Sequence, residues 1–238
     1  MRRNPAPTPE RERLAADPFP VVLAGPSGSG KTTIGRQLVE LRSDIRFSIS
    51  ATTRDARPGE ADGEDYHFMD RTEFERLRDE DGFLEWAEVH GALYGTPRSN
   101  FLEAREAGEK LLLDIDVQGA RSVRERLDET VSIFVVPPSG DEILRRLRGR
   151  GTEDTARLRR RLRSAESELA AMEEFDYVVV NDRLREAVSR VEAIVDAESS
   201  RIERLGESVQ VAAEEFVDEI HRAAASGESA APGEVDEA

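Results

Sequence analysis

Short apolar runs and stretches with helical periodicity alternate along most of this 238-residue chain. Apolar runs typical of buried strands lie at residues 21–23, 111–116, 131–136 and 177–180. Apolar residues recur at helical spacing at Ile34, Leu38 and Leu41, at Leu158, Leu162, Ala165, Leu169 and Met172, and at Leu184, Val188, Val191 and Val195. Strands that alternate with helices predict an α/β fold, a three-layer sandwich with a parallel central sheet and ligands at the carboxyl ends of its strands.

Residues 50–98 interrupt this regular alternation. Apolar and polar residues alternate, as in half-buried strands, at 47–50, 66–69 and 83–89. Between them, residues 70–81 have helical spacing at Phe74 and Leu77. We therefore expect a small β-rich insertion at 50–98 within the α/β core.

The two ends of the chain differ in composition from the middle. Residues 1–18 are rich in proline and charge, which predicts disorder. Residues 206–225 predict an extra amphipathic helix, which packs on its own domain or on a partner, the first being favoured. Residues 226–238 predict a disordered acidic tail. One folded domain is expected at 19–205, with its core at 19–49, 99–138 and 175–205, the insertion at 50–98, and an Arg-rich helical lid at 139–174.

The formal net charge is −16, which opposes anion binding by the surface as a whole and does not suggest a nucleic-acid-binding face. Residues 206–238 contain nine acidic residues and one arginine, so half of the excess charge lies there. The absence of cysteine excludes disulfides and thiolate metal sites, and three scattered histidines do not predict a metal cluster. Neither a secretory signal nor a run of about 18 apolar residues is found, so we expect a cytoplasmic protein without membrane partners.

The most specific motif is Gly25-Pro26-Ser27-Gly28-Ser29-Gly30-Lys31-Thr32, which matches the G-x-x-x-x-G-K-[ST] pattern of a phosphate-binding loop. Gly28 and Gly30 can adopt backbone angles that turn successive N–H groups toward a phosphate. Thr32 and Thr33 begin a helix whose N-terminus also favours an anion. Lys31 is expected to reach the outer phosphates, and the Thr32 hydroxyl to ligate Mg²⁺. The motif predicts a nucleoside triphosphate site; the flanking strand and helix disfavour a chance Gly/Ser turn.

Two further groups of residues fit such a site. Asp114 lies in the second apolar run, where phosphate-loop proteins often place an acid that holds magnesium. Arg54 and Arg57 precede a Pro-Gly turn and offer planar guanidinium groups suited to a second phosphate, to which Tyr66 and Tyr94 can add hydroxyl donors. The alternative for this second group is a solvated charged loop with aromatic residues in the core.

The lid is rich in arginine. Its arginines are Arg145, Arg146, Arg148, Arg150, Arg157, Arg159, Arg160, Arg161 and Arg163. A helical hairpin of this kind, with glycine at its bend, can close over a triphosphate and neutralise charge on the transferred group. We expect two or three of these arginines to do so and the others to lie on the surface.

In chain order, these motifs resemble the guanylate kinase family over about residues 20–200. Besides the phosphate loop, the resemblance rests on SATTR-x-x-R-x-GE at 50–60, G-x-DY-x-F at 63–68, FLEWA at 83–87, YGTP at 94–97, LDID-x-QG at 113–119 and RGT at 150–152. So many ordered motifs at compatible spacing are far more specific than the phosphate loop alone. Ala51 stands where the family often has serine.

The resemblance implies phosphorylation of GMP and dGMP by ATP with Mg²⁺, in a phosphate-loop NTPase-type fold with a core, a GMP-binding region and a lid. It implies that the GMP phosphate contacts Arg54, Arg57, Tyr66 and Tyr94. It implies that guanine contacts Ser50, Glu85, Thr96 and Asp116, with Asp114 close by in the same site. It also implies phosphate contacts from Arg146, Arg150 and Arg161, and an adenine pocket that closes near Asn181. The implied catalytic residues are Lys31, Arg54, Arg146, Arg150 and Arg161.

Glu85 suits guanine because a carboxylate can accept from both N1–H and the 2-amino group, whereas adenine presents an acceptor at N1. An inactive interaction module with a kinase-like sequence is the first alternative, and the intact phosphate loop with Lys31 disfavours it. A related kinase with another small phosphorylated acceptor is the second, and Glu85, Thr96 and Asp116 disfavour it. The expected partners are therefore ATP with GMP or dGMP, and both a monomer and a homo-oligomer are compatible with the sequence.

Overall fold

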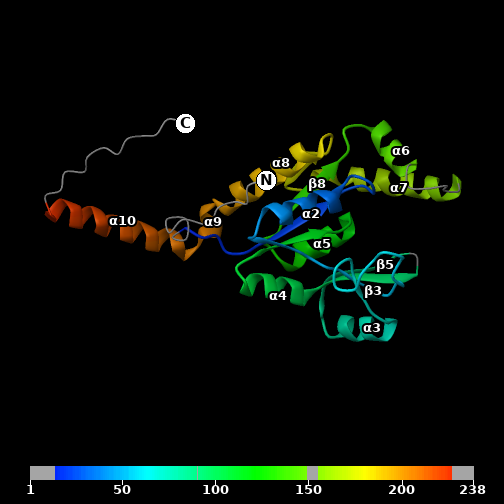
Figure 1. The fold of residues 1–238 in the computed structure, drawn as a ribbon, viewed down its shortest axis with the longest axis horizontal. Coiled ribbons are helices and arrows are strands. Elements are labelled where there is room, and N and C mark those ends of the chain that lie inside the picture. Colours follow the sequence, from blue (N-terminus) through cyan, green and yellow to red (C-terminus); the bar gives the residue numbers. More distant parts are fainter. Residues whose placement is uncertain (1–13, 90, 149–154, 227–238) are drawn as a thin grey trace. The chain divides into compact units, whose positions relative to one another are not determined.

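The computed structural model of the chain describes residues 14–89, 91–148 and 155–226 (Figure 1). Side chains are described throughout these ranges except at 147, 148, 155–161, 225 and 226. The described residues form two compact units, one of residues 18–196 and one that combines 14–17 with 197–226. Most of the segments predicted to be disordered, 1–18 and 226–238, lie outside the described residues.

The first unit is built on a five-stranded sheet whose neighbouring strands are all parallel. In spatial order the strands are β2 (Ile45–Phe47), β7 (Lys110–Asp114), β1 (Pro20–Ala24), β8 (Val131–Val136) and β9 (Tyr177–Val180). β1 is central, because Val21 pairs with Leu112 on one side and with Val131 on the other. The predicted parallel central sheet is confirmed, and all of its strands end at the same edge.

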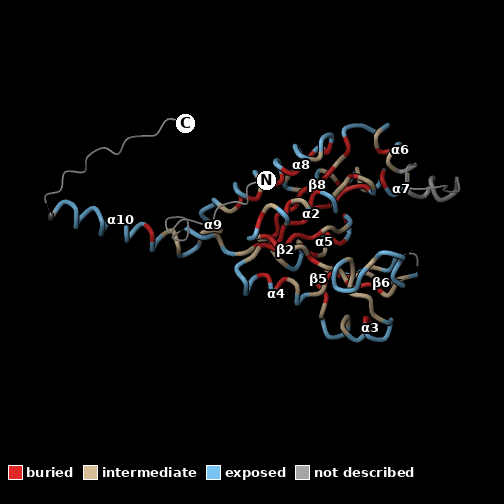
Figure 2. The backbone as a smooth tube through the Cα atoms, in the orientation of Figure 1, coloured by how far each residue is buried: buried red, intermediate tan, exposed pale blue. Residues whose placement is uncertain are grey.

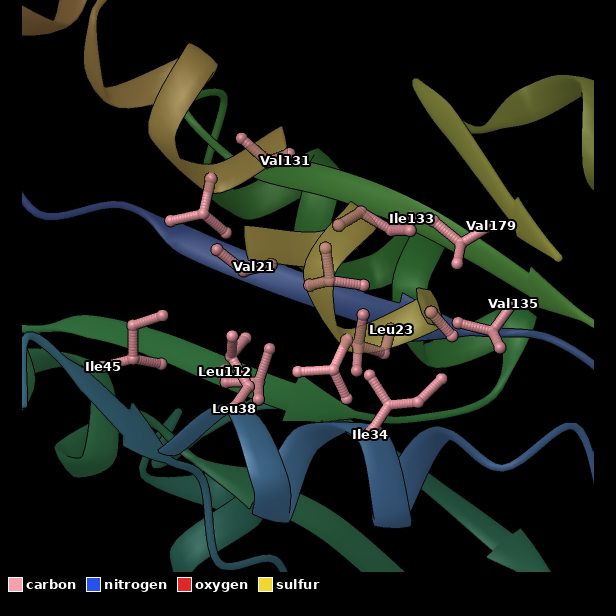
Figure 3. Close-up of a cluster of buried hydrophobic side chains, with 14 of the residues drawn as sticks. Val21, Leu23, Ile34, Leu38, Ile45, Leu112, Val131, Ile133, Val135 and Val179 are labelled. Atoms are coloured by element: carbon pink, nitrogen blue, oxygen red, sulfur yellow. The ribbon is translucent and has the colours of Figure 1, made fainter. Parts of the chain in front are cut away.

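Helices cover both faces of this sheet and make the three layers. On one face, Val21 and Leu23 of β1 pack into a cluster with residues of α2 (Lys31–Leu41) and α8 (Leu184–Ser199), as Figure 3 shows for Ile34 of α2. On the other face, Val22 and Ala24 pack with residues of α4 (Arg98–Glu106) and α5 (Val117–Arg126). Burial of both faces explains why β1 is an unbroken apolar run rather than an alternating one.

The insertion forms a second sheet with its own small core. In spatial order its strands are β4 (His67–Phe68), β3 (Ala51–Thr52), β6 (Ala92–Pro97) and β5 (Phe83–Val89). Helix α3 (Arg71–Asp79) begins after Asp70, whose carboxylate accepts from the Glu73 N–H at 2.8 Å. Phe74 of α3 stacks on Phe83 of β5 with ring centroids 4.3 Å apart. The buried cluster consists of Ala51, Phe74, Phe83 and Leu93.

The prediction of a single strand at 47–50 is wrong. β2 ends at Phe47 in the central sheet, and β3 begins at Ala51 in the insertion sheet, so the intervening residues cross between the sheets. Ser48 is buried. Asn100 Nδ2 donates to its Oγ at 3.0 Å and to the Ile49 carbonyl at 2.9 Å, so the polar groups of the crossing are satisfied. The alternation of residue types therefore marks a hydrogen-bonded crossing and not the two faces of one strand.

The apolar pattern likewise does not predict α5. Its first turn is capped by Asp116, whose carboxylate accepts from the Gly119 N–H at 2.8 Å. The predicted strand at 111–116 is too long, because β7 ends at Asp114 and Asp116 already caps α5. The buried residues Val117, Ala120 and Val123 follow helical spacing, and this spacing could have predicted the helix. The rest of the helix is strongly polar.

The lid contains α6 (Gly140–Arg148) and α7 (Thr155–Ala170), followed by a short 3₁₀ turn, η1 (Met172–Glu174). The Ser139 hydroxyl oxygen caps α6 by accepting from the Glu142 N–H at 3.2 Å. Ile143 and Ala165 are buried where the two helices meet. Arg150 lies outside the described residues, as does the side chain of Arg161.

The second unit contains the end of α8, α9 (Ile202–Leu205) and α10 (Glu207–Ser226). It begins at residue 197, somewhat before the predicted domain boundary at 205. The Asp17 N–H donates to the Arg204 carbonyl at 2.8 Å, which ties the chain before β1 to α9. α10 occupies the stretch for which an amphipathic helix is predicted, and most of it is exposed (Figure 2). Within the described ranges, no helix has the length and apolar character needed to cross a membrane.

Leu112 tests the assigned core, since it lies fully buried in β7 between β1 and β2. Leu112→Ala is expected to lower the free energy of unfolding by about 2–5 kcal/mol, because the lost methyl groups leave a cavity. Urea denaturation measures this loss. Leu102→Ala is the matched control, because Leu102 is 54% exposed and its loss should change stability by about 0.5 kcal/mol or less. Equal losses in both variants would contradict the packing described above.

Candidate active site

The phosphate loop connects the end of β1 to the start of α2, at the carboxyl edge of the central sheet. Gly25 and Gly30 have φ angles of +135° and +97°, which L side chains rarely adopt. A Cβ at Gly25 would lie 2.2 Å from the Val135 carbonyl oxygen, and one at Gly30 would lie 2.3 Å from Asn181 Nδ2. Glycine is therefore required at both positions by backbone angle and by space. Gly28, predicted to need similar freedom, has φ +86°.

Lys31 and Thr32 converge on Asp114 at the end of β7. Lys31 Nζ donates to the Gly25 carbonyl at 2.8 Å and lies 4.0 Å from Asp114 Oδ1. The Thr32 hydroxyl donates to Asp114 Oδ2. A hydroxyl and a carboxylate in contact are the hard oxygen donors that Mg²⁺ prefers, and Mg²⁺ usually completes its shell with water and substrate phosphates. These two residues therefore fit the predicted metal position, although the described residues contain no cluster of three or more acidic, His or Cys ligands.

Arg146 and Asn181 brace the outside of the phosphate loop. Arg146 Nη1 donates to the carbonyls of Gly28 and Ser29, each at 3.3 Å, and its Nη2 donates to the Asn181 carbonyl at 3.1 Å. The buried amide of Asn181 donates to the Ser29 carbonyl at 2.7 Å. Glu142, one helical turn before Arg146, accepts from Arg146 Nε. In an anion-binding loop the N–H groups face inward and the carbonyls face outward. The side chains of Arg146 and Asn181 bind carbonyls of this loop and so favour that arrangement.

In the insertion, Arg54 is held by Glu60 and by a neighbouring aromatic ring. Its Nη1 and Nη2 donate to the two carboxylate oxygens of Glu60 at 2.9 and 3.0 Å. Its guanidinium carbon lies 5.3 Å from the ring centroid of Tyr66, and the Tyr66 and Tyr94 rings are 6.1 Å apart. Arg54 Nε is buried and has no hydrogen-bond partner in the described part of the chain. Arg54, Tyr66 and Tyr94 therefore lie together, with the Arg54 guanidinium paired with a carboxylate.

Glu60 organises this cluster and was quoted in the motif without a predicted role. It pairs with Arg54, which is the main cause that lowers its pKa, and it also accepts from the Arg57 N–H at 2.8 Å. In turn, the Glu60 carboxylate raises the pKa of Arg54. The Arg57 side chain is exposed, so of the two predicted phosphate arginines only Arg54 is fixed in place.

Glu85, Thr96 and Asp116 come together at the junction of the insertion and the core. The Thr96 hydroxyl donates to Glu85 Oε1 at 2.6 Å. A Cβ at Gly119 of α5 would lie 3.1 Å from Glu85 Oε2, a tight contact for which the Glu85 side chain would have to shift by a few tenths of an ångström. Burial, and to a lesser extent the charge of Asp116, raises the pKa of Glu85 to about 7. Ser50 lies at the crossing before β3, where its carbonyl accepts from the His67 N–H at 2.9 Å.

The lid contributes a second residue that the sequence reasoning missed. Glu168 of α7 accepts from the Ser164 hydroxyl at 2.8 Å and from the backbone N–H of Ser27 in the phosphate loop. Burial raises its pKa, and the positive charge of Lys31 opposes that shift. The sequence of α7 does not indicate this contact, because Glu168 and Ser27 lie far apart in the chain.

A phosphate loop on the central strand, an acid on the neighbouring strand and an inserted sheet with a second group of polar residues are typical of a phosphate-loop nucleoside monophosphate kinase. Residues 18–198 match the family model described as guanylate kinase. The chain is 45% identical to the guanylate kinase of Caldanaerobacter subterraneus subsp. tengcongensis over 77% of its own length and 89% of the relative. It is 44% identical to that of Clostridium perfringens (strain 13 / Type A) over 84% of its length and 92% of the relative.

A solved structure agrees with these relatives. The crystal structure of guanylate kinase from Anaplasma phagocytophilum superposes with a TM-score of 0.67 at 37% identity, covering 82% of this chain and 97% of that one. The chain belongs to the guanylate kinase family, and the reaction is the ATP-dependent phosphorylation of GMP.

The raised pKa of Glu85 makes a prediction about stability. The ordinary glutamate pKa of 4.5 applies to the unfolded chain, so between pH 4.5 and about 7 the folded state binds the proton more tightly. The stability of the wild type should therefore fall, relative to Glu85→Gln, as pH rises through this window, by roughly 3 kcal/mol at most. Urea denaturation of both proteins at pH 5 and pH 8 measures the difference.

Glu88→Gln is the control for this comparison, because Glu88 lies on the same strand with an exposed side chain. Its stability relative to the wild type should change little between the two pH values. A constant difference between wild type and Glu85→Gln at pH 5 and pH 8 would show that Glu85 titrates as it does in the unfolded chain.

Proposed function

We propose that the donor ATP binds at Gly25, Pro26, Ser27, Gly28, Ser29, Gly30, Lys31, Thr32 and Thr33. The contacts of Arg146 and Asn181 with loop carbonyls support this, because they hold the loop from outside. The Ser27 and Ser29 N–H groups donate to Glu168 and to the Pro26 carbonyl, so the phosphates are assigned to the N–H groups of Gly28 and of the residues from Gly30 onward. Thr32 and Asp114 hold Mg²⁺, which when bound neutralises charge on the phosphates. Asn181 borders the adenine pocket from the back of the loop.

The acceptor GMP or dGMP binds across the insertion. Arg54, Arg57, Tyr66 and Tyr94 hold its phosphate. Ser50, Glu85, Thr96 and Asp116 read its guanine, with Asp114 in the same site. The observation that carries this assignment is the buried Glu85 carboxylate, fixed by Thr96 and lacking a basic partner among the contacts described. Guanine supplies the two donors that such a carboxylate needs, and a base that lacks them leaves a buried acceptor unpaired.

Phosphoryl transfer proceeds in line, without a covalent enzyme intermediate. Lys31, Arg54, Arg146, Arg150 and Arg161 are the proposed catalytic residues. They position the two phosphates and neutralise the charge that spreads over the transferred group. Closure of the insertion and of the lid excludes water and so limits hydrolysis of ATP.

The division into a kinase-like domain at 19–205, an extra helix at 206–225 and an acidic tail at 226–238 remains part of the proposal. Within the kinase domain, the core comprises 19–49, 99–138 and 175–205, with the GMP-binding region at 50–98 and the lid at 139–174. The enzyme would act in the cytoplasm, in purine nucleotide metabolism, where it returns GMP to the diphosphate pool. ATP and GMP or dGMP are its partners, with neither nucleic acid nor membrane involved.

The acceptor assignment is tested by assaying ADP release at pH 8 with ATP, Mg²⁺ and either GMP, dGMP, AMP, CMP or UMP. Turnover is expected with GMP and dGMP alone. Glu85→Gln should lower kcat/KM for GMP by about 10- to 100-fold, since it removes a charge-assisted hydrogen bond and misplaces an amide donor. Glu88→Gln, with its exposed side chain, should retain wild-type activity. Equal activity of the two variants would contradict the role of Glu85.

Lys31→Ala tests the donor site. The variant should have no measurable turnover, because it removes the positive charge that Lys31 places beside the loop and Asp114. Circular dichroism and the urea midpoint report whether the fold is intact, and they should match the wild type closely. Near-normal turnover in a folded Lys31→Ala protein would overturn the assignment of the catalytic lysine.

A further inference from the structure

An ion pair joins the helix of the phosphate loop to the insertion. Arg36 lies on α2, and Asp65 lies in the turn that precedes β4. Arg36 Nη2 donates to Asp65 Oδ1 at 2.7 Å. The two side chains are 57% and 26% exposed, so the pair is partly open to solvent. Unlike the pairs within α3, it connects the donor side of the enzyme with the acceptor side.

Asp65 is fixed on the insertion side of this pair. Its Oδ2 accepts from the Ala61 N–H at 3.0 Å, and its own N–H donates to the Ala61 carbonyl at the same distance. The Ala61 N–H and, next, Arg36 lower the pKa of Asp65, so the carboxylate is charged at neutral pH. Asp65 is therefore the fixed, anionic member of the ion pair.

The turn closed by Asp65 leads directly into Tyr66, whose ring lies beside the guanidinium of Arg54. At the other end of the pair, Arg36 belongs to the same helix that begins at Lys31. A helix of this length moves as one body, so the ion pair links the position of Lys31 to that of Tyr66 and Arg54.

We propose that Arg36 is a positioning residue, which through Asp65 sets the distance between the GMP-phosphate cluster and the phosphate loop. The inference rests on the proposed binding of the GMP phosphate at Arg54 and Tyr66. Transfer between two phosphates depends steeply on how they are aligned, so a link outside both substrate sites can affect the reaction. Neither Arg36 nor Asp65 needs to contact a substrate for this effect.

The expected size follows from the exposure of the pair, because partly solvated ion pairs contribute modestly. Arg36→Ala should raise KM for GMP about two- to five-fold. KM for ATP should stay within about 1.5-fold of wild type, because the phosphate loop is braced separately by Arg146 and Asn181. Added KCl should raise KM for GMP in the wild type more than in Arg36→Ala, since salt screens the pair.

The experiment is a double-mutant cycle on KM for GMP with wild type, Arg36→Ala, Asp65→Asn and the double variant. Asparagine keeps an oxygen that can accept from the Ala61 N–H, so the turn is preserved while the charge is removed. Arg36→Lys should recover part of the loss. Arg76→Ala is the matched control: Arg76 is 52% exposed and pairs with Glu73 and Glu80, which lie within or just after α3.

Support for the proposal is a double variant with the same KM as Arg36→Ala, together with an unchanged KM in Arg76→Ala. Additive effects of the two single variants, or an equal rise in Arg76→Ala, would overturn it. Arg54→Ala in the same assay separates the two levels of inference. A normal KM for GMP in Arg54→Ala refutes the acceptor site itself, whereas a large rise there with a silent Arg36→Ala refutes only the positioning role.

Discussion

The site depends on a steric constraint: the phosphate loop must pass against the ends of β8 and β9 with no room for a Cβ at Gly25 or Gly30. That close passage places loop carbonyls within reach of Arg146 and of the Asn181 amide. These contacts hold the loop from outside, while inside it the Ser29 N–H donates to the Pro26 carbonyl at 3.0 Å. Lys31 and Thr32 follow the loop directly, so their position relative to Asp114 is a consequence of the same packing.

A protein with a net charge of −16 binds two polyanions because its acids near the site are paired or neutralised. Glu60 is paired with Arg54, Glu142 with Arg146, and Asp114 lies beside Lys31. Glu85 has no such basic partner among the contacts described, and burial favours its neutral form and shifts its pKa to about 7. In the proposed binding mode this carboxylate reads guanine, and it is costly to ionise until two donors reach it.

Patterns in the sequence predict what depends on local burial or on a fixed loop geometry. β8 matches its apolar run because both of its faces are buried, and the phosphate loop follows from its glycines and lysine. β9 also matches its apolar run, although it is an edge strand on which Val178 and Val180 are exposed. The crossing after Phe47 and the contacts of Glu60 and Glu168 are not predicted, because they depend on Asn100, Arg54 and Ser27 from other segments. Helix α5 is missed because its buried face has few apolar residues, and those are small.

The insertion has a hydrophobic core of its own, distinct from the two clusters that flank the central sheet. Its connection to the central sheet combines both kinds of contact, because Leu84 of β5 is buried in the cluster of Val22 and Leu113 while Asn100 binds the crossing by hydrogen bonds. Apolar packing has few alternative arrangements of similar energy, whereas solvated polar contacts break and reform at low cost. The insertion is therefore anchored at Leu84 and Asn100, which lie at the base of its sheet, and it is held by a solvated polar contact at the Arg36–Asp65 pair. The distance between the two sides is thus more easily adjusted at the ion pair than at the apolar anchor.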